Sequence, residues 1–313
     1  MKLDFSDINV LLIGDFMIDH YMMGISNRIS PEAQVPVVIP RKEYSIPGGA
    51  GNVAMNLSAM GANVTCLGVV GDDIWGEKLL SLLKNEGINT EDIDVVKGHP
   101  TTLKQRIYSN GKQVARVDTE KIVDYSFLSN INLTKHLKKH HVCILSDYNK
   151  GIIQNADLEN NHQMFDTNIL IVDPKKNDFS FYRNANIITP NLNELQKATK
   201  TKIQDSQSIV AACTELIRKH DFNYIVAKRG AEGMTIIGKN NFIKHIKAHN
   251  VEDPDVTGAG DTVIAALSIA YAKTQNIEIS AHFANNAAAI VVGKSGTATA
   301  TIQEIEKIST LLY

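Results

Sequence analysis

The sequence predicts an α/β protein in which helices flank a mostly parallel, buried central sheet and a small additional β-sheet forms a lid. Short apolar runs rich in valine and isoleucine alternate with longer amphipathic segments, as in successive βαβ units. Two extended segments, residues 21–46 and 101–117, interrupt this alternation without helical periodicity. A large α/β sheet with a small appendage accommodates 313 residues, so we expect one domain over residues 1–313.

The individual elements follow from the same periodicities. Strands are predicted in short apolar runs, at residues 9–13, 64–70, 142–146, 169–173, 187–189 and 224–228. Helices are predicted in amphipathic segments, at residues 52–60, 76–86, 192–199, 208–220, 258–272 and 279–292. Alternating stretches at residues 35–39 and 113–117 predict strands of a separate sheet. Because ligands of open α/β sheets bind at the carboxyl ends of the strands, we expect residues of about 20–46 and 101–118 to pair into a lid over that edge.

Composition and charge exclude several partners. With 32 basic and 34 acidic side chains, the formal net charge of -2 indicates neither nucleic acid nor an anionic membrane as a partner. The first apolar run ends at Ile13 and is too short for a signal sequence or a membrane span. The cysteines Cys66, Cys143 and Cys213 lack metal-ligand spacing, which indicates buried thiols in a reducing compartment. We therefore expect a cytoplasmic protein, and we interpret the basic run at residues 138–141 as a solvated helix end.

The most specific motif is Asp255-Val-Thr-Gly-Ala-Gly-Asp261, which an apolar helical run follows. Gly258, Ala259 and Gly260 let the backbone approach a ligand, and the free N–H groups of a first helical turn favour an anion. A phosphoryl group in transfer is such an anion. Asp261 comes directly after these residues and can accept a proton from an attacking hydroxyl, which makes it the candidate general base. The alternative interpretation is an aspartate that caps a helix.

A second glycine-rich turn runs from Pro47 to Asn52 and precedes the first predicted helix. Its glycines permit backbone contact with a hydroxylated ligand, and Asn52 can both donate to and accept from a diol. A purely structural turn is the alternative. Asp19 follows the first strand closely, where a carboxylate can bind two sugar hydroxyls or simply occupy a surface turn.

A third polar group follows the strand predicted at residues 187–189. Asn191 and Glu194 are one helical turn apart and can hold Mg²⁺ through water or order phosphates. The alternative is an N-capped helix start with a capping box. Two nucleotide-binding patterns are excluded: Gly293-Lys-Ser295 follows Ala288 where a P-loop requires glycine, and neither glycine cluster fits the dinucleotide-binding pattern.

Together, the turn at residues 48–52 and the motif at residues 255–261 closely resemble the two signatures of the ribokinase-like (PfkB) carbohydrate kinases. The resemblance extends over nearly the whole chain. It implies a three-layer ribokinase-like fold, a lid that often mediates homodimer formation, ATP with Mg²⁺ as cosubstrate, and a monovalent cation as a further candidate cofactor. It also implies that Asp261 is the base and that residues 258–260 form the anion hole.

The same resemblance assigns the remaining binding residues. It implies that the sugar hydroxyls are bound by Asp19, Gly48, Gly49 and Asn52. It implies contacts with ATP or its metal, the latter indirectly through Glu194, by Asn191, Leu192, Asn193, Glu194, Lys228, Gly230, Thr257 and Asn286. Lys228 departs from the pattern, because many family members have threonine or serine there.

Several stretches are similar to one branch of the family, the heptose 7-phosphate kinases of lipopolysaccharide core synthesis; they are residues 13–19, 28–36, 146–151, 172–175 and 291–298. The resemblance implies ATP-dependent phosphorylation of the anomeric hydroxyl of D-glycero-β-D-manno-heptose 7-phosphate to the 1,7-bisphosphate, on the route to ADP-heptose. A substrate that already bears a phosphate needs cationic partners. The candidate substrate-binding residues are therefore Lys104, Arg106, Arg116, Lys150 and Lys175, with Asp147.

Two other functions remain open. One is another sugar kinase of the same family, acting on ribose, a fructose phosphate or a nucleoside. The other is a non-catalytic sugar or nucleotide sensor, which would be expected to lack the base. Kinases of this branch are often fused to a nucleotidyltransferase, so we expect either a stand-alone kinase or the kinase part of a longer protein.

Overall fold

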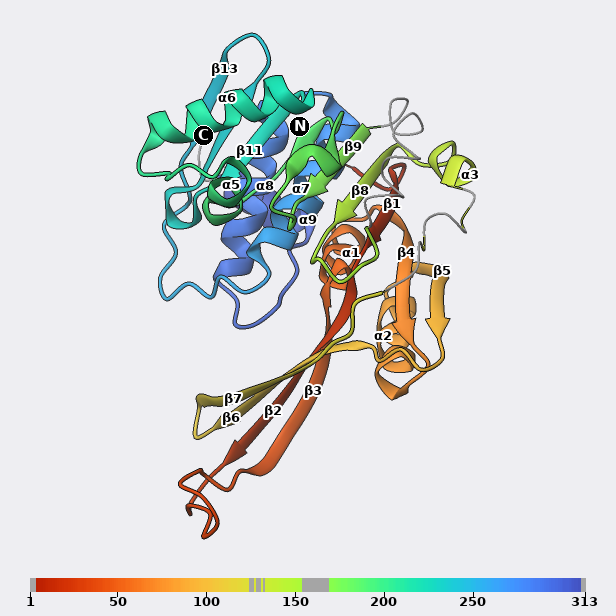
Figure 1. Ribbon diagram of the computed structural model, residues 1–313, viewed down its shortest axis with the longest axis vertical. Helices are drawn as coiled ribbons and strands as arrows, with labels where there is room; N and C mark the ends of the chain where they lie inside the picture. Colours follow the sequence, from red (N-terminus) through yellow and green to blue (C-terminus); the bar gives the residue numbers. More distant parts are fainter. Residues whose placement is uncertain (1–3, 124–126, 128–130, 132, 154–168, 311–313) are drawn as a thin grey trace.

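The computed structural model describes residues 4–310 except 124–126, 128–130, 132 and 154–168 (Figure 1). Within these residues, nine strands form a large sheet in the order β13-β12-β11-β10-β9-β8-β1-β4-β5. Neighbours from β11 to β5 are parallel, and β12 and β13 join antiparallel at one edge. The strands are β1 (Asn9–Gly14), β4 (Asn63–Gly71), β5 (Asn89–Val96), β8 (Val142–Ser146), β9 (Ile169–Asp173), β10 (Ile187–Ile188), β11 (Tyr224–Lys228), β12 (Met234–Gly238) and β13 (Phe242–Ile246).

The large sheet is buried on both faces, which explains its apolar strands. In β1, Val10 and Leu12 belong to one hydrophobic cluster, while Leu11 and Ile13 belong to another. The first cluster is covered by α1 (Ala50–Ala59), α2 (Ile74–Asn85), α7 (Ala259–Thr274), α8 (Ile277–Val292) and α9 (Ile302–Thr310). The second is covered by α3 (Leu133–Leu137), α5 (Leu192–Thr199) and α6 (Ser206–His220). The predicted three-layer α/β architecture is confirmed.

The separate small sheet is also confirmed, and it extends away from the body of the molecule (Figure 1). Its order is β3-β2-β6-β7, from β2 (Phe16–Ile25), β3 (Ile39–Gly49), β6 (Thr102–Ser109) and β7 (Lys112–Thr119). Only Asp15 separates β2 from β1, so the chain passes directly from the large sheet into the small one. The strand predicted at residues 35–39 is wrong: β3 begins at Ile39, and the preceding segment forms one isolated bridge, at Pro36, whose ring has no N–H to donate.

Other differences concern boundaries and edges. Several helices begin about one half turn earlier than predicted, as α2 does, where the Asp73 side chain accepts from the N–H groups of Trp75 and Gly76. The edge strands β5 and β13, and β12 beside β13, were not predicted. In β13, partly buried and exposed residues alternate up to the buried Ile246, over only 5 residues. The three cysteines are buried, as predicted. Among the described helices, none combines the length and apolar character needed to cross a bilayer.

Candidate active site

The two glycine-rich turns meet where α7 and α1 begin. Gly258 caps α7 with a φ of 76°, and a Cβ atom built on it would lie 2.7 Å from Nδ2 of Asn52. Only glycine fits this position, because other residues would be strained and would collide with Asn52. Asp261 lies three residues after Gly258, and its Oδ2 atom accepts a hydrogen bond of 2.8 Å from the same Nδ2 atom. Two segments distant in sequence therefore build one polar centre.

Asp261 lies in the first turn of α7 and is only 7% exposed. Its Oδ1 atom accepts a hydrogen bond of 2.5 Å from the hydroxyl of Tyr148, so both oxygens are held by uncharged donors. Burial raises the pKa of Asp261 to about 6 against the lowering effect of these two bonds, and the charge of Asp173 adds to the rise. A carboxylate with this pKa is ionised at neutral pH and can take up a proton.

Tyr148 was not among the predicted site residues, although it lies two residues after the end of β8, next to the predicted Asp147. Oδ2 of Asp15 accepts from the backbone N–H of Tyr148 at 2.7 Å. Asp147 is buried and accepts from the Tyr182 hydroxyl at 2.5 Å and from the N–H of Asn149 at 2.6 Å. Burial and the nearby Asp147 raise the pKa of Asp15 to about 6. The loop that carries Tyr148 is thus fixed from both sides.

A small cavity of about 190 Å³ opens at the carboxyl ends of β8, β9 and β11. Residues predicted for the catalytic centre, for ATP and for the sugar line this cavity together with three unpredicted ones. The lining residues are Asp147, Tyr148, Asp173, Pro174, Lys175, Asn191, Glu194, Lys228, Gly258, Gly260 and Asp261. Lys228 forms an ion pair with Asp173, and its Nζ atom lies 3.5 Å from where a Cβ of Gly260 would be. Burial alone would lower the pKa of Lys228, but the charges of Asp173 and Glu194 raise it. An ammonium group therefore faces the glycine turn.

A larger cavity of about 700 Å³ adjoins the small one and shares Asn191, Lys228 and Gly260 with it. The rest of its wall is largely apolar and includes Met234, Val251, Val256, Val263, Ala288 and Val292. Gly230, predicted to contact the nucleotide, lines this cavity. Asn286 does not line it, but accepts a hydrogen bond of 2.8 Å from His249, which does. A flat apolar ring system in the large cavity would place attached phosphates toward the small one.

Some predicted nucleotide contacts have structural partners instead. Asn191 and Glu194 form the capping box given as the alternative interpretation, yet both line the small cavity. Leu192 packs against the hydrophobic core, and Asn193 is exposed. Thr257 donates its N–H to Asp255 at 3.0 Å and lines neither cavity.

The predicted sugar residues gather beside Asp19, which is buried on β2. Oδ1 of Asp19 accepts from Arg106 at 2.5 Å, and a Cβ on Gly48 would lie 2.4 Å from Oδ2 of the same carboxylate. Gly49, with a φ of 55°, ends β3 next to it. The neighbouring Lys104 lies over the ring of Tyr148, with Nζ 5.5 Å from the ring centroid. The Tyr148 ring therefore lies between Lys104, the register partner of Asp19, and Asp261. Asn52 contacts Asp261 directly.

The predicted cations do not form a single cluster. Arg116 is opposite Arg106 in the register of β6 and β7 and is bound to Asp118 through two hydrogen bonds of 2.8 and 2.7 Å. Lys150 instead pairs with Glu120 at 2.5 Å and lines neither of the two cavities. Lys175 lines the small cavity, where it bonds to Glu194 at 3.2 Å.

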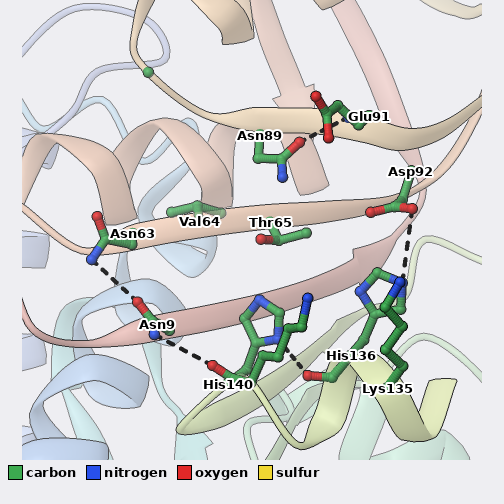
Figure 2. Close-up of a pocket in the computed structure, with 12 residues that line it drawn as sticks. Asn9, Asn63, Val64, Thr65, Asn89, Glu91, Asp92, Lys135, His136 and His140 are labelled. Atoms are coloured by element: carbon green, nitrogen blue, oxygen red, sulfur yellow. Dashed lines mark hydrogen bonds and ion pairs between the residues drawn. The ribbon is translucent and has the colours of Figure 1, made fainter.

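A third cavity, of about 550 Å³, lies at the opposite end of the large sheet (Figure 2). Asn9, Asn63 and Asn89, the first residues of their strands, form part of its wall, and His136 approaches Asp92 with Nε2 3.8 Å from Oδ1. None of the predicted site residues lines it. Within the described part of the chain, no three histidine, cysteine or acidic side chains are grouped closely enough to hold a metal ion.

A family profile and similar proteins of known sequence agree on the family of this chain. The profile of the family described as "pfkB family carbohydrate kinase" matches residues 7–304. The chain is 40% identical over 311 residues to the bifunctional protein HldE of Aliarcobacter butzleri, covering 97% of this chain and 65% of that protein. For HldE of Campylobacter curvus the identity is 39%, covering 96% and 65%. The chain thus spans about 65% of the length of these relatives.

Solved structures share the fold at low sequence identity. Phosphofructokinase-2 from Escherichia coli in complex with potassium superposes with a TM-score of 0.79 and 19% identity, covering 97% of this chain and 98% of the other. Ribokinase from Arabidopsis thaliana complexed with ribose and ATP has a TM-score of 0.77 at 17% identity, covering 96% and 98%. These likenesses establish the fold.

Proposed function

Because the chain belongs to the pfkB family and is an ATP-dependent carbohydrate kinase, we propose that it transfers the γ-phosphoryl group of ATP to the anomeric hydroxyl of a heptose 7-phosphate. The observation that most directly supports a kinase site here is the hydrogen bond between Asn52 and Asp261, the latter of which lines the small cavity. Similarity to the bifunctional HldE proteins and the residues resembling heptose 7-phosphate kinases support this substrate.

In this proposal Asp261 accepts the proton of the attacking hydroxyl, and the oxygen attacks phosphorus in line as the bond to ADP breaks. The N–H groups of the turn at Gly258, Ala259 and Gly260 stabilise the charge that develops on the phosphoryl oxygens. ATP occupies the large cavity, which leads its phosphates past Lys228 into the small one.

The small cavity also contains groups that fit Mg²⁺ carried by ATP. Glu194 supplies carboxylate oxygens, the ligand type that Mg²⁺ prefers, whereas Asp147 is bound by Tyr182 and Asp173 pairs with Lys228. Mg²⁺ that enters with a nucleotide needs only one or two carboxylates besides phosphates and water, so Glu194 would hold it through water. Bound there, the ion would neutralise phosphate charge; positioning and proton transfer remain with the protein side chains.

The far end of the sugar requires a second anion site. Lys104 and Arg106 on β6 and Arg116 on β7 project from the small sheet beside Asp19. We assign the 7-phosphate to these cations and the hydroxyls to Asp19, the turn at residues 48–49 and Asn52. Closure of the small sheet as a lid would exclude water that otherwise hydrolyses ATP.

The same sheet exposes apolar side chains on its strands, including Ile39, Tyr44, Val114 and Val117. Such side chains fit the homodimer contact that the resemblance implies. Sedimentation equilibrium tests this: a dimer that Val117→Asp dissociates supports the assignment, and a monomeric native chain refutes it.

A coupled ADP-release assay over a sugar panel tests the substrate. The panel compares heptose 7-phosphate with heptose, ribose, fructose 6-phosphate and a nucleoside, each with and without K⁺. We expect the highest kcat/KM with heptose 7-phosphate. Turnover restricted to unphosphorylated sugars would refute that substrate but leave the kinase assignment intact.

A further inference from the structure

We infer that Tyr148 is a positioning residue that holds the general base Asp261 in its reactive orientation and connects it to Lys104 of the small sheet. The inference rests on the proposed role of Asp261. Figure 1 shows the two elements involved: the loop after β8, which carries Tyr148, and the root of the small sheet, where β6 begins. The Tyr148 hydroxyl lies 2.5 Å from Oδ1 of Asp261, and Lys104 Nζ lies 5.5 Å from the centre of the Tyr148 ring.

The bonds to Asp261 leave it able to react. Each carboxylate oxygen has two lone pairs, and Asn52 and Tyr148 occupy one on each oxygen. The remaining lone pairs can accept the substrate hydroxyl, while two fixed donors restrict rotation of the carboxyl group. A single donor would leave rotation about the Cβ–Cγ bond less restricted. Tyr148 therefore fixes the direction from which the hydroxyl is deprotonated.

The loop holds Tyr148 rigidly enough for this role. Its backbone N–H and that of Lys150 both donate to Oδ2 of Asp15, at 2.7 and 3.1 Å. On the preceding residue, Asp147 is bound by Tyr182. These anchors lie in the buried end of the large sheet, so the hydroxyl keeps its place without substrate.

Tyr148 also affects the proton affinity of the base. Burial raises the pKa of Asp261, and the hydrogen bonds from Tyr148 and Asn52 lower it because they stabilise the charged form. Of the charged groups that face Asp261 from β9 and β11, Asp173 raises this pKa further and Lys228 lowers it. Burial and the charge of Asp261 raise the pKa of the Tyr148 hydroxyl well above its usual value, so Tyr148 stays protonated and remains a donor. Loss of the hydroxyl should make Asp261 harder to ionise.

The test is the pH dependence of kcat/KM for Tyr148→Phe, measured with whichever sugar the native enzyme phosphorylates best. Because a hydrogen bond to a charged carboxylate stabilises its ionised form, we expect the acidic limb of the pH profile to move up by about 1 to 2 pH units. Loss of positioning should lower kcat by about tenfold. Tyr271→Phe is the matched control, because Tyr271 is a buried tyrosine of α7, the helix that carries Asp261, and packs against Tyr224. Its acid limb should stay at the native position.

A second substitution keeps the test independent of any folding defect in Tyr148→Phe. Replacement of Tyr148 by 3-fluorotyrosine keeps the ring and hydroxyl but makes a stronger donor, so the acid limb should move down. An unchanged acid limb in both proteins would overturn the inference. An active Asp261→Asn enzyme would instead refute the base assignment, so the two failures are distinguishable.

Discussion

Asn52 and Asp261 are 209 residues apart in the chain, yet a hydrogen bond of 2.8 Å joins their side chains. Thr262, next to Asp261, donates its hydroxyl to Asn56, one turn after Asn52, at 3.1 Å. The start of α1 and the start of α7 are therefore fixed to each other at two consecutive turns. This contact positions Asp261, the proposed base, between the predicted sugar residues on one side and the turn at Gly258 on the other.

Gly258→Ala should disrupt that contact. The added methyl group would collide with Asn52, and the φ of 76° adds strain, so we expect a loss of about 1 to 3 kcal/mol in unfolding free energy and a large loss of kcat. Gly87→Ala is the matched control, since Gly87 has a φ of 73° with open space around it. Chemical denaturation and kinase assays compare the two. Equal stability and full activity in both variants would contradict the close approach.

Lys104→Met should separate phosphate recognition from chemistry. Lys104 lies in the register position beside Asp19, where we place the sugar phosphate, so loss of its charge should raise KM for phosphorylated sugars by about tenfold to a hundredfold. KM for ATP should stay constant. Lys112→Met, at the exposed start of β7, serves as the control. A selective rise in KM for unphosphorylated sugars would exclude Lys104 from the phosphate site.

The acid limb of the native pH profile should reflect Asp261. Because its pKa is raised to about 6, the base is protonated and inactive below that pH, and log kcat/KM should fall with unit slope as the pH decreases from about 6 to 5. Initial rates in buffers of constant ionic strength measure this. An activity that stays constant down to about pH 5 would indicate a different base or a much lower pKa.

The same pKa predicts a pH-dependent stability difference. Asp261 binds a proton more tightly in the folded chain than in the unfolded one, so its contribution to stability falls as the pH rises from about 4 through 6. Asp261→Asn lacks this loss. Relative to the native chain, the variant should gain about 1 kcal/mol between about pH 5 and pH 8 in urea unfolding. A constant difference across that range would contradict the raised pKa.

The fold could be predicted because its signals are local. The run from Val10 to Ile13 is apolar on both faces, which only a sheet with helices on both sides buries. The edge strand β13 lacked this signal, since its residues alternate in exposure. A strand was wrongly predicted at residues 35–39, because alternation indicates an extended chain but does not show that it pairs with a neighbour. Pro36, which has no N–H to donate, limits such pairing to one isolated bridge.

The meeting of the two glycine-bearing segments at the candidate site could be anticipated where backbone conformation decides it. The glycines at positions 48 and 49 end β3, and those at 258 and 260 begin α7, so they mark the points where the backbone changes direction or approaches another group closely. Tyr148 was not predictable in this way, because its bond to Asp261 spans 113 residues. Its place directly after a buried strand, beside the candidate Asp147, was the available signal. Lys150 was predicted to bind the substrate phosphate, but its ammonium group forms an ion pair with Glu120, and nothing in the sequence indicated this partner.

The measurement that tests the central claim most directly is single-turnover phosphoryl transfer by Asp261→Asn, with ATP affinity measured on the same protein. The asparagine keeps the size of the side chain but cannot take the proton, so we expect unchanged ATP binding and a transfer rate lower by about two to four powers of ten. A variant that binds ATP and transfers phosphate at the native rate would contradict the role of Asp261 and the mechanism built on it.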